Sequence, residues 1–184
     1  MRRVAITGIG CVSSLGHDVP TFLEATREGR SGVAPTTLAD ADKLTARNVA
    51  EVKNWDGAAA LDRKLLNLAD RFSQFAVSAA KQAAADAGDI SGERSAVFVG
   101  TGVGGAHTIE EGYDRLWRQD QQRVHAFKIP RLMANGPPSL IGLEFGVTGP
   151  AFAVSSACSS SNHSIGTAFG MIRRGEIDVA LAGG

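Results

Sequence analysis

One cysteine lies where the sequence could support nucleophilic chemistry. Cys158 follows a short apolar run and three small residues, and apolar side chains then recur at helical spacing from Ile165 to Ile172. This order predicts a strand, a sharp turn and a helix, with the thiol at the start of the helix. Free backbone N–H groups and the positive end of the helix dipole favour a thiolate there, so Cys158 is a candidate nucleophile. A buried structural cysteine is the alternative, because free cysteine is among the most commonly buried residues.

The other thiol and the imidazoles are less well placed for chemistry. Cys11 follows a glycine-rich turn and has neither a following helix nor a nearby base, so we expect a structural role for it. His163 lies about 140° around a helix from Cys158, so we expect it to face away from the thiol and to be structural. Three histidines have no recognisable relation to Cys158: His17, His107 and His125.

Strands and helices alternate along the chain that must position Cys158. Short apolar runs predict buried strands at residues 3–9, 96–100 and 178–182, besides the strand that follows Gly149 and Pro150. Strands that alternate with helices, two of them short and apolar on both faces, are typical of a parallel or mixed sheet covered on both sides. The fold class is therefore α/β.

The clearest helical pattern covers residues 61–87, where apolar residues recur at spacings of three and four and Gly88 ends the run. Residues 31–55 carry little periodicity and predict a long irregular excursion. Further helices are expected at 22–28 with an Asp18 or Thr21 cap, at 139–145 after two tolerated prolines, and after Cys158 to about Arg174.

Composition limits the classes of function. The 184 residues are 43% hydrophobic and 21% charged, which fits one globular domain. Nineteen basic residues balance nineteen acidic ones, so the net charge does not call for nucleic acid or an anionic membrane. Two cysteines make no disulfide framework, and no apolar run approaches the roughly 20 residues that span a bilayer. We expect a cytoplasmic protein.

Three glycines formally satisfy a dinucleotide-binding pattern. Gly100, Gly102 and Gly105 form G-x-G-x-x-G after the strand at 96–100. A dinucleotide site also needs an acidic residue at the end of a second strand about 20 residues further on, and residues 120–123 form no apolar strand. We therefore expect the glycines to let the backbone turn tightly beside the pocket of Cys158, with no cofactor and no metal.

Residues 156–160 (SACSS), with His163, Ile165 and Gly166, resemble the nucleophile segment of the β-ketoacyl-[acyl carrier protein] synthases, condensing enzymes of the thiolase superfamily. Five further segments recur in the family's order: residues 4–10, 29–32, 70–72, 100–105 and 146–150. The resemblance implies a thiolase-like fold in which residues 1–184 are the N-terminal αβα half of a five-layered αβαβα architecture. The second half would lie beyond residue 184.

The resemblance also implies a reaction. Cys158 would take an acyl group from acyl carrier protein as a thioester, and a malonyl-carrier thioester would then be decarboxylated and condensed with it, in fatty-acid or polyketide synthesis. The family's condensation step uses two histidines of the second half, so this chain alone is expected to lack that step. The family's assembly predicts a homodimer, or pairing with the missing C-terminal half.

Three other positions receive roles from the resemblance. Ile109 matches a position that lines the acyl pocket, with plain packing as the alternative. Arg63 and Lys64 match a basic pair that docks carrier protein, although further basic positions of that patch are Asn67 and Leu68 here. A solvated helix end is the alternative for the basic pair. Two local departures from the family pattern are Ser161 in place of glycine and the Gly-Pro-Pro at 136–138.

Two classes of function remain open. The first is a condensing enzyme, and the second is a non-catalytic structural half or a partner subunit that resembles a chain-length factor. Cys158 favours the enzyme, because a subunit that only shapes a pocket needs no nucleophile. A thiolase that uses coenzyme A shares the fold, but the local motif fits the carrier-dependent branch better.

Overall fold

A three-stranded parallel sheet forms the centre of the computed structural model, which describes residues 2–38, 41–123 and 126–184. The strand order is β4 (Ala151–Val154), β3 (Ser95–Gly100), β5 (Val179–Gly183). Both neighbours pair with β3 in parallel, with Val97 opposite Ala151 on one side and Leu181 on the other. The predicted α/β class and the strand at 96–100 are confirmed.

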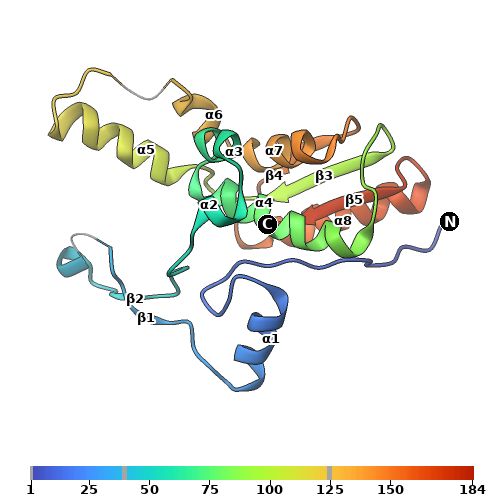
Figure 1. The fold of residues 1–184 in the computed structure, drawn as a ribbon, viewed down its shortest axis with the longest axis horizontal. Helices are drawn as coiled ribbons and strands as arrows, with labels where there is room; N and C mark the ends of the chain where they lie inside the picture. Colours follow the sequence, from blue (N-terminus) through green and yellow to red (C-terminus); the bar gives the residue numbers. More distant parts are fainter. Residues whose placement is uncertain (1, 39–40, 124–125) are drawn as a thin grey trace.

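Helices cover both faces of the sheet (Figure 1). Val97 and Val99 of β3 pack in one core cluster against α3 (Arg63–Leu68), α4 (Arg71–Ala87) and α7 (Gly136–Phe145). The alternate residues Ala96 and Phe98 pack in a second cluster with α8 (Ser160–Arg174). Since successive side chains of a strand point to opposite faces, β3 forms the centre of both clusters.

The remaining elements lie outside these layers. Short elements occupy much of the predicted irregular excursion at 31–55: β1 (Ala34–Pro35), η1 (Ala41–Lys43) and β2 (Asn48–Val49). Helices α5 (Ala106–Tyr113) and α6 (Lys128–Leu132) lie together beyond one end of the sheet, and a π-helical turn, η2 (Asp114–Arg118), extends α5 (Figure 1). In the described ranges no helix is long and apolar enough to cross a membrane.

The prediction of one helix over residues 61–87 is wrong. Two helices occupy the segment, α3 and α4, and a one-turn helix, α2 (Gly57–Ala60), precedes them. The break occurs because Asp70 has an extended backbone (φ −67°, ψ 162°) and its side chain accepts a hydrogen bond from the Phe72 N–H, which caps α4. Asp62 caps α3 in the same way through the Leu65 N–H. Gly88 ends α4 as predicted, with φ 87°.

The predicted buried strand at residues 3–9 is also wrong. The segment pairs with no strand in the described structure, and the Ile6 side chain is 82% exposed. Gly8 and Gly10 lie instead against α4, where an added Cβ at either position would be 1.9 Å from a backbone carbonyl oxygen, that of Ala83 or Ala79. Close backbone packing on a helix thus replaces strand pairing.

Three other predicted elements need smaller corrections. Helix α1 (Val19–Arg27) begins before residue 22, because Asp18 rather than Thr21 is its cap. Helix α7 begins at Gly136 rather than at residue 139, since prolines fit a first helical turn. Strand β5 exists where expected, but it is an edge strand and is only half-buried, with one residue exposed.

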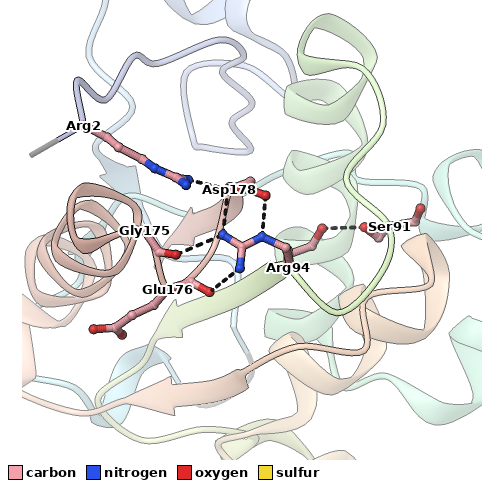
Figure 2. A network of polar contacts seen from close by, with 7 residues as sticks. Arg2, Ser91, Arg94, Gly175, Glu176 and Asp178 are labelled. Carbon is pink, nitrogen blue, oxygen red and sulfur yellow. Dashed lines mark hydrogen bonds and ion pairs between the residues drawn. The ribbon is translucent and has the colours of Figure 1, made fainter.

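A cluster of charged side chains joins four segments at the amino ends of the strands (Figure 2). The Arg94 guanidinium donates from Nε to Asp178 Oδ2 at 2.6 Å and from Nη2 to Asp178 Oδ1 at 2.9 Å. Arg2 donates to the same carboxylate at 2.5 Å, and Arg94 also donates to the Gly175 carbonyl at 2.9 Å. Hydrogen bonds from Arg94 and Arg2 lower the pKa of Asp178 well below its usual range.

This cluster predicts acid-sensitive stability. Folding lowers the pKa of Asp178, so its ionised carboxylate adds to the free energy of unfolding above the ordinary aspartate pKa of about 4. This stabilisation is lost as the pH falls from about 4 toward the folded-state pKa. We expect Asp178→Asn to lower the melting temperature at pH 7, and the difference from the wild type to shrink below about pH 4. Circular dichroism melts at several pH values measure this, with the exposed Asp86→Asn as the matched control. An unchanged difference at low pH would contradict the prediction.

Exposed apolar side chains predict self-association. Ile165 and Phe169 lie one turn apart on α8 and are 48% and 45% exposed, and Phe152 of β4 is 44% exposed. Soluble monomers rarely expose contiguous apolar patches above a few hundred Å². We expect the purified chain to sediment as a dimer or larger species at micromolar concentration. A clean 19.2 kDa monomer with a sharp cooperative melt would disprove this.

Candidate active site

Cys158 lies in a turn between β4 and α8, at the carboxyl edge of the sheet. The turn is a short 3₁₀ element, η3 (Ala157–Ser159), and α8 begins directly after it. The predicted order of strand, turn and helix is therefore confirmed. Ala157 has φ +51°, in the left-handed region that residues other than glycine rarely adopt. The Cys158 residue is exposed, so the alternative of a buried structural cysteine is wrong.

Side-chain hydrogen bonds hold this turn. The Ser159 hydroxyl donates to the Ser156 carbonyl at 2.8 Å, and the Ser160 hydroxyl donates to the Ala157 carbonyl at 2.7 Å while accepting from the Ser156 N–H at 2.9 Å. The Ser156 hydroxyl lies 2.6 Å from Nδ1 of His163. His163 thus contacts the residue just before the strained position, which agrees with the structural role expected for it. Its orientation relative to the thiol stays a prediction.

The glycine loop at residues 100–105 packs against the same turn. An added Cβ at Gly100 would lie 2.5 Å from the carbonyl carbon of Ser160, so only glycine allows the end of β3 to approach the start of α8 this closely. An added Cβ at Gly102 would lie 4.0 Å from the Cα of Ala157. The Thr101 N–H also donates to the Val154 carbonyl at 3.0 Å. The loop therefore lies beside the turn of Cys158, as predicted.

Dinucleotide binding gains no support from this loop. Helix α5 does follow it directly, but residues 119–123 form no second strand that could bring an acidic residue to a ribose. Within the described ranges, no group of three or more His, Cys, Asp or Glu side chains could hold a metal ion.

Cys11 has the environment of an unreactive thiol. It is half-buried, and its backbone N–H and carbonyl both bond the side chain of Gln82, at 3.2 and 3.1 Å. Burial raises the pKa of the Cys11 thiol, and the negative charge of Asp18 raises it further. Both effects reduce the thiolate fraction at neutral pH.

The other predicted site residues lie on separate elements. Ile109 is half-buried on α5, and Arg63 and Lys64 are exposed in the first turn of α3. Among the described residues, no hydrogen bond or ion pair joins any of them to Cys158, so their roles stay predictions. His107 is exposed on α5, and His17 lies edge-on to Trp55 with ring centroids 5.4 Å apart. His125 lies outside the described residues.

A buried carboxyl group lies behind the glycine loop, where the sequence pattern did not predict one. Asp70 is 2% exposed, and an added Cβ at Gly105 would lie 3.1 Å from its Oδ2. The same Oδ2 accepts a hydrogen bond from the Thr108 N–H at 2.8 Å. An aspartate inside an otherwise apolar helical pattern is the signal that could have revealed this cap.

Comparisons with known proteins agree on one family. The family model described as "Beta-ketoacyl synthase, N-terminal domain" matches residues 1–184. The chain is 36% identical to 3-oxoacyl-[acyl-carrier-protein] synthase 2 of Coxiella burnetii over 100% of its own length and 45% of that protein. It is 40% identical to nodulation protein E of a Rhizobium species, over 46% of that protein. The chain thus spans about half the length of these relatives.

Solved structures share the fold. A structure described as the ishigamide ketosynthase/chain length factor superposes with a TM-score of 0.88 at 33% identity, over 100% of this chain and 47% of that one. A β-ketoacyl synthase from Burkholderia phymatum superposes with a TM-score of 0.82 at 29% identity, over 96% of this chain and 45% of that one. The expected thiolase-like α/β fold is confirmed.

The geometry of the two thiols predicts selective alkylation. Cys158 is exposed in a strained turn before a helix, whereas the pKa of Cys11 is raised by burial. We expect iodoacetamide at neutral pH to label Cys158 several-fold faster than Cys11. Peptide mass mapping over time measures the two rates, and Cys158→Ser is the control that isolates labelling of Cys11. Equal or preferential labelling of Cys11 would remove the argument for an activated thiol.

Proposed function

The chain belongs to the β-ketoacyl synthase family, whose N-terminal-domain model matches all of its residues, and from this membership we propose that it is the acyl-accepting part of a condensing enzyme. Residues 1–184 would form the N-terminal domain of that enzyme, with Cys158 as its nucleophile. The observation that carries the proposal is the exposed Cys158 on a turn between β4 and α8. The family's relatives named as synthases support the reaction class.

The first stage is transfer of an acyl group to Cys158. The thiolate attacks the carbonyl carbon of an acyl-carrier thioester, the tetrahedral intermediate collapses, and the carrier leaves as a thiol after taking a proton. The backbone N–H of Cys158 would help to hold the oxyanion of that intermediate. The exposure of Cys158 supports its role as nucleophile, because a thioester can reach an exposed residue.

The second stage is condensation with a malonyl-carrier thioester. Loss of carbon dioxide leaves a carbanion, which attacks the acyl-enzyme carbonyl and releases Cys158 as the thiolate. This stage needs bases that the family resemblance assigns to two histidines of a second half. In the described part of this chain, His163 is engaged with Ser156 instead. We therefore propose that the 184-residue chain performs the first stage and not the second.

The partners follow from the same proposal. Acyl carrier protein would dock at the exposed pair Arg63 and Lys64, because an acidic partner is attracted to local positive charge even when the net charge is zero. Ile109 would line the acyl pocket. The assembly would be a homodimer or a pairing with a C-terminal half, in the cytoplasm, serving fatty-acid or polyketide synthesis.

A partner subunit that resembles a chain-length factor is the second candidate. The observation that favours it is the similarity to the solved structure described as the ishigamide ketosynthase/chain length factor. The exposed Cys158 favours the enzyme, because shaping a pocket requires no accessible thiol.

Acyl transfer tests the proposal directly. We expect an acyl–coenzyme A or acyl-carrier thioester to add one acyl group to the wild-type chain, located at Cys158 by peptide mass mapping. Cys158→Ala should lose this adduct entirely while melting like the wild type. With malonyl-carrier thioester added, the chain should release no β-ketoacyl product, because the bases for that stage are lacking. An adduct on Cys11 would contradict the nucleophile assignment, and a condensed product would contradict the division into stages.

A further inference from the structure

One buried carboxyl group caps two helices. Asp70 is the N-cap residue of α4, where its Oδ1 accepts a hydrogen bond from the Phe72 N–H at 3.4 Å. Its Oδ2 accepts from the Thr108 N–H at 2.8 Å and from the Thr108 hydroxyl in a shorter bond. Thr108 lies in the first turn of α5, whose own N-cap residue, Gly105, has no side chain to bond. Asp70 therefore supplies the cap that α5 lacks.

This pair is buried and spans a long stretch of sequence. Asp70 is 2% exposed and Thr108 is 3% exposed, and 38 residues separate them. A buried carboxyl group is costly unless its oxygens are bonded. The partially positive amino ends of two helices and the Thr108 hydroxyl meet that requirement. The bond therefore fixes α5 relative to α4.

The first turn of α5 is joined directly to the loop beside Cys158. The Gly104 N–H donates to the Thr101 hydroxyl at 3.1 Å, and the Gly105 N–H donates to the Leu132 carbonyl at 3.0 Å. At its other end the loop packs on the start of α8 through Gly100. The loop is thus held between β3, whose six residues are all buried, and α5, which Asp70 caps.

We propose that Asp70 and Thr108 are positioning residues that hold loop 100–105 as a wall of the site at Cys158. The wall orients an incoming acyl thioester against the thiol. This inference rests on the proposed acyl transfer, and it adds two residues that touch neither the thiol nor the acyl group. A purely structural role for the same pair would affect only the stability of the chain.

Two reactions of the same thiol separate these roles. Iodoacetamide is small and needs only an accessible thiol, whereas an acyl thioester must be oriented against it. The test variant is Thr108→Val, which keeps the shape and the backbone N–H but removes the hydroxyl donor. Thr108→Ser restores that donor and is the matched control. Asp70→Asn is the isosteric variant of the acceptor: it keeps one accepting oxygen and replaces the other by an NH2 group that only donates, so the bonds from Phe72 and Thr108 cannot both remain.

We expect Thr108→Val and Asp70→Asn to lower the maximal rate of Cys158 acylation by acyl–coenzyme A about three- to tenfold, the effect of one hydrogen bond. The iodoacetamide rate should stay within about twofold of the wild type, because the thiol itself is untouched. Thr108→Ser should acylate at the wild-type rate. Hydrogen exchange should be faster at the amides of α5 in Thr108→Val and unchanged in Thr108→Ser.

Three results would overturn the inference. The first is acylation of Thr108→Val at the wild-type rate. The second is an equal loss of the acylation rate and the iodoacetamide rate in Thr108→Val, together with a lowered melting temperature. The third is unchanged exchange at α5 in Thr108→Val. If the wild-type chain takes no acyl group, the proposed function fails, and the exchange comparison alone then decides whether Asp70 holds α5.

Discussion

The structure depends on the burial of one strand on both of its faces. All six residues of β3 are buried, and its alternate side chains form the centres of two separate core clusters. The helices on either face are located by their contacts with this strand. Because β4 and β5 both pair with β3, the carboxyl ends of the strands are brought together at one edge. Loops at that edge of a parallel sheet are the usual place for a site.

The candidate site is a consequence of this edge. The turn after β4 carries Cys158, and the loop after β3 packs beside it through Gly100, which leaves no room for a side chain. The turn is held by serine hydroxyls and by His163 rather than by apolar packing. Hydrogen bonds suit this position, because they fix backbone geometry at the surface without covering the thiol.

Local patterns in the sequence predicted those elements whose form depends on neighbouring residues. The strand at 96–100, the helix that ends at Gly175 and the turn at Cys158 have local signals, and the motifs around Cys158 identified the family. Elements that depend on distant partners were not predictable. Residues 3–9 have the composition of a strand, but Gly8, like the following Gly10, packs on α4 instead. The break at Asp70 is stabilised partly by Thr108, 38 residues away, which no local window contains.

The order of the strands along the chain has a consequence for synthesis on the ribosome. The central strand β3 comes first, and its two neighbours come later, with β5 reaching residue 183. The Arg2–Asp178 bond joins residues 176 positions apart. Contacts of such long range form slowly, because loop closure must precede them. A nascent chain therefore carries the apolar strand β3 without either neighbour while residues 101–150 are made, which makes it a natural client for chaperones that bind extended apolar segments.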